Sequence, residues 1–180
     1  MKYIKEYNEY IDPFNEEDWD EVEPLEPDGT FLTWLKNKCP DDSKWKDIEE
    51  LDCGYKKLTD LIGIEKLINL KYLFCDNNQL TELDITKNIE LETLYCNKNQ
   101  LTELDITNNI KLRYLYCYSN QLTELNATNN IKLRYLLCHH NQLTELNISK
   151  NIKLERLYSH HNQLTELDVG KNINLTHKRI

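Results

Sequence analysis

Glycine and proline are scarce in this chain: there are four of each among 180 residues, and Ala127 is the only alanine. The chain therefore has few of the residues that favour tight turns, which argues against a loop-rich enzyme. No apolar run approaches the 18 residues that a membrane-spanning helix requires. The first ten residues lack the apolar segment of a secretory signal, so the sequence predicts a cytoplasmic protein, in its own cell or in a host cell.

The chain also lacks net positive charge. Its formal net charge of −9 at pH 7 argues against general affinity for nucleic acid or anionic membranes. The charge is unevenly distributed, because residues 1–47 contain 14 acidic residues against six lysines, whereas residues 48–180 are almost neutral. We therefore divide the chain into an acidic N-terminal segment and cap, residues 1–47, and a second region, residues 48–180.

The acidic charge is concentrated in residues 12–28, which hold nine carboxylates and no basic residue. Such blocks repel themselves, stay extended and often serve as interaction tails. The candidate interaction residues of this acidic segment are Glu16, Glu17, Asp18, Trp19, Asp20, Glu21 and Glu23. Upstream, the apolar residues from Tyr3 to Ile11 recur at helical spacing, and downstream, residues 30–38 read as a short amphipathic helix. The cap is therefore expected to be helical.

A 21-residue repeat fills the second region. Its units begin at Leu70, Leu91, Leu112, Leu133, Leu154 and Leu175, the last cut short, and a looser copy begins at Ile48. A single unit buries too little apolar surface to offset the entropy of ordering its residues, whereas stacked units share one core. The alternation of apolar and polar residues predicts one short strand per unit, paired in parallel with its neighbours at about 4.8 Å.

The unit reads Leu-x-x-Leu-x-Cys-x-x-Asn-x-Leu and resembles the leucine-rich repeat. The closest likeness is to the short bacterial type with cysteine at the sixth position, similar to the cysteine-ladder internalins. The resemblance covers residues 48–180. It implies a solenoid, α/β by the convention of that family, with a parallel concave β-sheet, an extended or 3₁₀ convex side and a small helical N-terminal cap. It also implies a protein-binding module.

Two columns of the repeat are expected to be structural. The inward cysteine column is Cys53, Cys75, Cys96, Cys117 and Cys138, with Ser159 in the fifth unit, and the asparagine column is Asn78, Asn99, Asn120, Asn141 and Asn162. Parallel side chains suit disulfide geometry poorly, so we expect buried thiols. Cys39 is expected to be the one exposed thiol. The asparagine amides are expected to satisfy backbone groups after each strand.

The outward strand positions predict an aromatic concave groove. Its candidate partner-binding residues are Tyr72, Phe74, Tyr95, Arg113, Tyr114, Tyr116, Tyr118, Arg134, Tyr135, His139, Arg156, Tyr158 and His160. Tyrosine and arginine dominate binding hot spots. The alternative is that tyrosine merely suits an exposed strand. The groove is mildly basic, so it suits an acidic protein segment, and also stacking on single-stranded RNA.

Four histidines, His139, His140, His160 and His161, lie in this groove. Neighbouring imidazoles could hold Zn²⁺ or Ni²⁺, or form a pH-sensitive patch. No cysteine or carboxylate of the same columns completes a ligand set in those units. We therefore expect no metal, no cofactor and no catalytic residue, and hence no enzymatic activity.

These features support two functional hypotheses. The first is a non-enzymatic module that binds a macromolecule, most simply a protein, through the groove. The second is a small acidic inhibitor that acts through residues 12–28 as a nucleic-acid mimic, of the kind that phages and mobile elements use against defence systems, such as an anti-CRISPR protein. Its target would be a nucleic-acid-binding enzyme. A homodimer through the C-terminal edge, where Lys178 replaces an inward leucine, is a further expectation. No membrane partner is expected.

Overall fold

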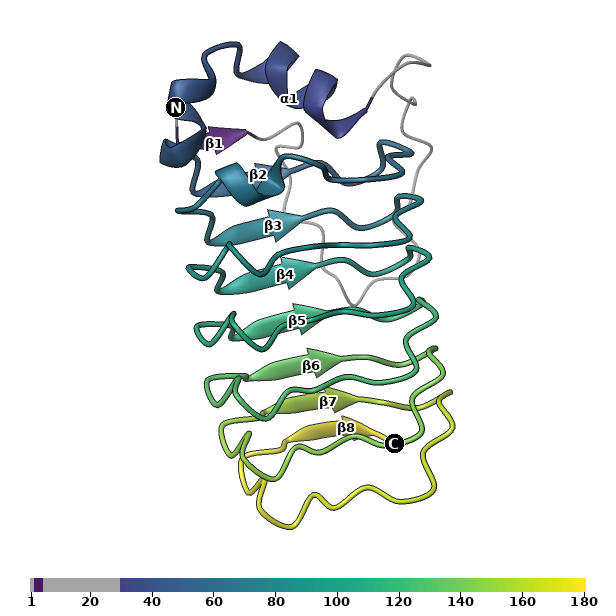
Figure 1. The fold of residues 1–180 in the computed structure, drawn as a ribbon. Coiled ribbons are helices and arrows are strands. Elements are labelled where there is room, and N and C mark those ends of the chain that lie inside the picture. The colour runs from purple at the N-terminus through teal and green to yellow at the C-terminus, as the bar shows by residue number, and fades with distance from the viewer. Residues whose placement is uncertain (1, 5–29) are drawn as a thin grey trace.

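A computed structural model describes residues 2–4 and 30–180 (Figure 1). In these residues eight short strands form one parallel sheet, in the order in which they occur along the chain. The strands are β1 (Tyr3–Ile4), β2 (Glu50–Asp52), β3 (Tyr72–Phe74), β4 (Thr93–Tyr95), β5 (Tyr114–Tyr116), β6 (Tyr135–Leu137), β7 (Arg156–Tyr158) and β8 (His177–Arg179). Each turn of the chain therefore adds one strand, which makes the molecule a solenoid.

The strands pair in the register that the repeat predicts. Leu73 is the Cα partner of Leu94, and Leu94 is the partner of Leu115, each 21 residues further along the chain. Equivalent residues of successive units therefore lie directly beside one another across the whole sheet. The predicted fold, a leucine-rich-repeat solenoid with a parallel sheet, is confirmed.

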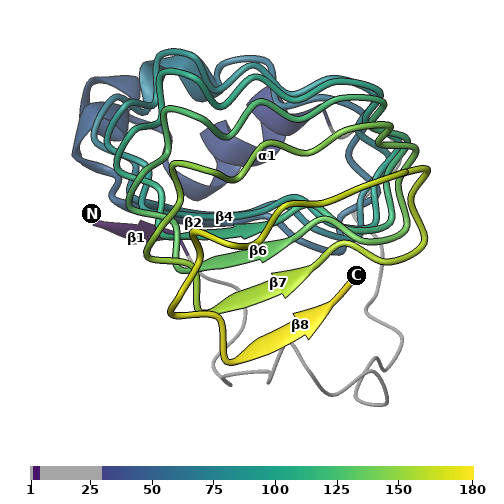
Figure 2. The ribbon, with the colours of Figure 1, turned by 90° about the horizontal axis from the view of Figure 1, so that it is seen from below.

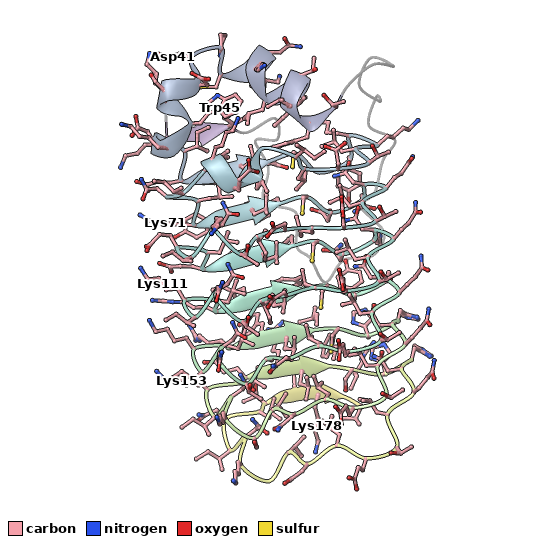
Figure 3. The ribbon with its side chains drawn as sticks, viewed as in Figure 1. Asp41, Trp45, Lys71, Lys111, Lys153 and Lys178 are labelled. Atoms are coloured by element: carbon pink, nitrogen blue, oxygen red, sulfur yellow. The ribbon has the colours of Figure 1, made fainter. Side chains whose placement is uncertain are left out.

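The core is a stack of inward leucines beside the cysteine column. The sulfur atoms follow one another from unit to unit (Figure 3), and all five cysteines of the column are free and fully buried. Burial raises the pKa of these thiols, that of Cys138 to about 12, because the thiolate would lose its hydration. Cys39 is also buried, at 4% exposure, so the prediction of an exposed thiol there was wrong. It lies within the cap, directly after α1, where its carbonyl accepts a hydrogen bond from Trp45 Nε1 at 2.9 Å.

The return half of each unit is mostly turn and extended chain. Viewed from one end (Figure 2), the strands line one side of the solenoid and the return segments line the other. The helical content of the described residues is limited to α1 (Phe31–Lys38) and two 3₁₀ turns, η1 (Asp42–Asp47) and η2 (Ile64–Lys66). Within residues 2–4 and 30–180, no helix has the length and apolar character needed to cross a bilayer.

The N-terminal cap covers the open end of the core. Helix α1 begins after Thr30, whose Oγ1 accepts a hydrogen bond from the Thr33 amide at 3.3 Å, and it buries Phe31, Trp34 and Leu35. The predicted helix over residues 30–38 is confirmed, because its apolar residues share one face and the N-cap satisfies an end amide.

The start of the chain is not helical where it is described. Tyr3 and Ile4 form β1, which pairs in parallel with β2, and Ile4 is buried in the core. The helical spacing from Tyr3 was therefore misleading at these two residues. The strand gains backbone partners along the free edge of β2, which outweighs the local pattern. Residues 5–11 lie outside the described part of the chain.

At the opposite end, β8 pairs with β7 alone among the described strands. Lys178 is in register with the inward Leu157 and is exposed, as the sequence suggested. The homodimer through this edge stays a prediction.

Candidate functional site

The concave face of the sheet carries three rows of side chains, defined by equivalent positions of the repeat. The first row is Tyr72, Thr93, Tyr114, Tyr135 and Arg156; the second is Phe74, Tyr95, Tyr116, Leu137 and Tyr158; the third is Asp76, Asn97, Tyr118, His139 and His160. The rows arise because strands in register bring equivalent side chains within contact distance across a parallel sheet. All the groove residues predicted from the sequence, except Arg113 and Arg134, lie in these rows.

The first three side chains of the second row are joined by ring contacts. Phe74 meets Tyr95 edge to face with ring centres 5.0 Å apart, and Tyr95 lies 4.0 Å from Tyr116. Phe74, Tyr95 and Tyr158 are partly exposed. Tyr116 is only 3% exposed, so its ring offers almost no surface to a partner. The close stacking that builds the row is what removes this ring from solvent.

The first row is the more open one. Tyr72 is 36% exposed, and Tyr114 and Tyr135 are half-buried and meet edge to face at 5.1 Å. The guanidinium of Arg156 lies 5.0 Å from the centre of the Tyr135 ring. Edge-to-face and cation–π contacts of this kind hold each ring in one orientation without covering both of its faces.

A row of charged residues borders the first row, one position before each strand. Arg134 binds Glu155 through two hydrogen bonds, Nε to Oε1 at 2.8 Å and Nη2 to Oε2 at 3.0 Å. Arg113 lies 3.4 Å from Glu92. Arg134 also donates to the hydroxyl of Tyr114 at 3.3 Å. The two arginines predicted to bind a partner are thus already paired across strands, which offsets the predicted basic character of the groove.

The third row changes from polar to aromatic along the solenoid. Tyr118 stacks on His139 at 4.5 Å, and His139 stacks on His160 at 4.7 Å with the ring planes 9° apart. His139 is 9% exposed because it is enclosed by these two rings. At the other end of the row, burial raises the pKa of Asp76 to about 6, although Asn77 donates a hydrogen bond to the carboxylate at 2.8 Å.

The predicted contact residues therefore divide into two groups. Those that keep accessible surface are Tyr72, Phe74, Tyr95, Arg113, Tyr114, Tyr118, Arg134, Tyr135, Arg156, Tyr158 and His160. Tyr116 and His139 lie on the same face but are buried, since each ring is stacked against its neighbours at about the strand spacing. The acidic segment from Glu16 to Glu23 lies outside the described residues.

The asparagine column behaves as predicted. Asn99 Nδ2 donates to the carbonyls of Cys75 and Cys96 at 3.0 and 3.1 Å, and its Oδ1 accepts from the Leu80 amide at 3.0 Å. The other members repeat this pattern from unit to unit. Each amide links two units through backbone groups that would otherwise be buried without partners.

Two further columns of the repeat were not predicted from the sequence. A second buried asparagine column, on the return side, is Asn88, Asn109, Asn130, Asn151 and Asn172. A column of isoleucines at least half exposed is Ile68, Ile89, Ile110, Ile131, Ile152 and Ile173. The isoleucines precede the strands by a few residues, at the same edge as Lys111 and Lys153 (Figure 3). Their 21-residue spacing was visible in the sequence, but spacing alone does not separate a buried column from an exposed one.

Comparison with known proteins supports this architecture by structure alone. No family model and no curated protein matches the sequence. Among solved structures, the functional domain of InlJ from Listeria monocytogenes, which includes a cysteine ladder, is 29% identical with a TM-score of 0.57; the match covers 77% of this chain and 40% of that one. A leucine-rich-repeat protein of Leptospira interrogans is also 29% identical, with a TM-score of 0.71 over 75% of this chain and 37% of that one.

YopM, a leucine-rich effector protein from Yersinia pestis, shares the fold at 24% identity and a TM-score of 0.61. The chain spans about 40% of the length of these structures. Proteins of this fold are in general protein-interaction modules and are typically non-enzymatic. Its in-register strands, its cysteine column and its asparagine column identify the chain as a leucine-rich-repeat protein with a cysteine ladder.

Proposed function

We propose that this chain binds a protein partner through the concave face of its sheet and catalyses no reaction. The observation that carries the proposal is the pair of aromatic rows that cross successive strands. In the first row Tyr114 and Tyr135 are in contact and partly exposed, and in the second row Phe74 and Tyr95 are in contact and partly exposed. Together these rings form a surface far richer in aromatic residues than an ordinary protein exterior.

The rings are already oriented before a partner arrives. Tyr114 is held by Tyr135 on one side and by a hydrogen bond from Arg134, which is itself clamped by Glu155. A side chain fixed in this way loses little rotamer entropy on binding, so more of its contact energy contributes to affinity. The strand propensity of tyrosine explains why such rings fold well on a sheet, but it does not require that they be clamped.

The charge of the face suits a partner of mixed character. Arg113 and Arg134 lie beside Glu92 and Glu155 on its border, so neither sign dominates there. A polyanion such as RNA would gain little from arginines already neutralised by carboxylates. A protein segment with apolar side chains and a few polar groups suits the surface better.

The test is partner capture from the native host with Tyr114 and Tyr135 both changed to threonine. Threonine is the matched replacement because Thr93 occupies the same row of the same sheet. The control changes the exposed convex residues Glu103 and Glu124 to glutamine. The proposal requires capture to be lost in the tyrosine variant and kept in the control.

The acidic inhibitor is the alternative, and it rests on residues 12–28, outside the described part of the chain. The structure changes how it should be tested. Deleting residues 1–28 would also remove β1 and the buried Ile4, and so uncover the edge of β2. Changing the nine carboxylates of residues 12–28 to amides removes the charge and leaves β1 in place.

A further inference from the structure

Four of the five histidines gather at two neighbouring units, which lie beyond the aromatic rows used in the proposed function. His139 and His140 follow strand β6, and His160 and His161 occupy the same two positions after β7. His139 stacks on His160 at 4.7 Å, and His140 stacks on His161 at 4.3 Å. Two parallel pairs of imidazoles thus lie side by side, and His140 meets His160 edge to face at 5.7 Å.

The ring nitrogens of this cluster converge. One nitrogen each from His139, His140 and His160 lies within 4.8 Å of the other two. In a tetrahedral zinc site the Zn–N bonds are about 2.0–2.1 Å, so ligand nitrogens lie about 3.3 Å apart. His140 is exposed and His160 is partly exposed, so these two rings have room to rotate and bring their nitrogens closer to that of His139.

Two ring nitrogens of the cluster lack a hydrogen-bond partner among the described residues. His139 Nδ1 and His160 Nδ1 are both buried and have no hydrogen-bond partner. An unpaired buried nitrogen is unfavourable unless a ligand occupies it.

We propose that His139, His140 and His160 bind one divalent transition-metal ion of the Zn²⁺ type through three imidazole nitrogens. His161, or a water molecule, completes the fourth position. The expectation of no metal rested on the lack of a cysteine or carboxylate in these columns, but three imidazoles are a complete protein ligand set for zinc. An all-nitrogen set selects Zn²⁺, Ni²⁺, Cu²⁺ or Co²⁺ over the oxygen-seeking Mg²⁺ and Ca²⁺.

The backbone and the neighbouring charge both bear on this site. His140 and His161 adopt the left-handed conformation, at φ of 52° and 53°, and Asn77 occupies the equivalent position in the unit that begins at Leu70, at φ of 53°. The guanidinium of Arg179 lies 5.5 Å from the centre of the Tyr158 ring, and that ring lies 6.2 Å from His139 and 6.3 Å from His160. The positive charge of Arg179 opposes a bound metal ion, so removing that charge should strengthen metal binding.

The test measures Zn²⁺ and Ni²⁺ binding to the untagged full chain at pH 7.5, by calorimetry and by competition with a chromophoric chelator. The variants are His139→Asn and His160→Asn, which place in the third row the residue that Asn97 already provides there, and His140→Asn, which restores the residue type of Asn77. The control is His177→Asn, because His177 is exposed and lies outside the cluster. Circular dichroism establishes that each variant is folded.

The proposal predicts one Zn²⁺ per chain at micromolar affinity or tighter. Each of the three cluster variants should weaken binding at least tenfold, His177→Asn should leave it unchanged, and Arg179→Gln should strengthen it several-fold. With Cu²⁺, the electron paramagnetic resonance spectrum of the wild-type chain should show hyperfine coupling to at least three nitrogens. Binding no tighter than millimolar, or equal losses in His139→Asn and His177→Asn, would overturn the proposal. A Cu²⁺ spectrum without nitrogen coupling would overturn it independently of any variant.

Discussion

Tyr114 and Tyr135 face each other across strands β5 and β6, with ring centres 5.1 Å apart and planes at 81°. The same repeat position supplies both rings, so their contact follows directly from the 21-residue period and the parallel register. Tyr95 and Tyr116 show the same relationship in the next row at 4.0 Å. Because the strands keep one register, side chains at the same repeat position come into contact across neighbouring strands. A substitution in one unit therefore changes the contacts of the equivalent side chains in the adjacent units.

Ser159 interrupts the cysteine column and gives the first prediction. It is 2% exposed, and its hydroxyl has no hydrogen-bond partner. A buried hydroxyl without a partner costs about 1–3 kcal/mol, so Ser159→Cys should raise the free energy of unfolding by about 1 kcal/mol or more, measured by urea denaturation. The reciprocal change, Cys138→Ser, should lower it. If Ser159→Cys were neutral or destabilising, the hydroxyl would have a partner in solution.

Asp76 gives a prediction about pH. Its pKa is about 6 in the folded protein against an ordinary value of 3.8, because burial disfavours the carboxylate. The folded state therefore binds a proton more tightly than the unfolded state, so stability falls as pH rises from about 4 to about 6 and stays lower above that. The two-unit difference corresponds to about 3 kcal/mol at about 1.36 kcal/mol per unit.

Asp76→Asn should remove this loss, and Asn97 shows that an amide is accommodated in the same row. The variant should match the wild-type stability near pH 4 and exceed it at pH 7.5, in urea melts at both values. Equal stability of the two proteins at pH 7.5 would show that the carboxylate is solvated.

The second asparagine column should be as important to stability as the first. Asn130 Nδ2 donates to the carbonyls of Ile106 and Asn109 at 3.0 and 2.9 Å, and the side chain is fully buried. Asn130→Ala leaves two buried carbonyls without that donor and should lower the free energy of unfolding by about 2–4 kcal/mol. The neighbouring Asn129 is exposed and donates only at 3.4 Å, so Asn129→Ala should cost less than about 0.5 kcal/mol. Similar losses for the two variants would contradict the assignment.

Much of this architecture could be predicted from the sequence because the period is strict. The leucine, cysteine and first asparagine columns follow from a pattern in which each buried position repeats every 21 residues. Features that occur once were not predictable in this way. Strand β1 has two residues and depends on the free edge of β2, and the burial of Cys39 depends on packing within the cap.

The sequence predicts which positions face outward on the binding face, but not which of their side chains are accessible to a partner. The sequence places Tyr95 and Tyr116 at the same outward position of the repeat, yet Tyr116 is buried and Tyr95 is partly exposed. The difference depends on how closely each ring stacks on its neighbours, and that distance is a property of the packed rows. The pairing of Arg134 with Glu155 likewise needs the register of two strands before it can be recognised.

The acidic segment provides a prediction that separates the two functional hypotheses. Amide substitution of all nine carboxylates in residues 12–28 should leave partner binding intact if the concave face carries the function, since β1 and the face are unchanged. Binding should be compared by calorimetry with the captured partner at two salt concentrations. A loss of binding in this variant would favour the acidic inhibitor.

The central claim is that the partly exposed tyrosines of the first row form the contact surface for a protein. The most direct measurement is the affinity of the captured partner for the wild-type chain and for the Tyr114→Thr, Tyr135→Thr double variant, with Glu103→Gln, Glu124→Gln as the control. The tyrosine pair should weaken binding at least 100-fold, because each hot-spot ring contributes about 2 kcal/mol or more, while the control binds as the wild type does. Undiminished affinity in the tyrosine variant, with the fold intact by circular dichroism, would contradict the account.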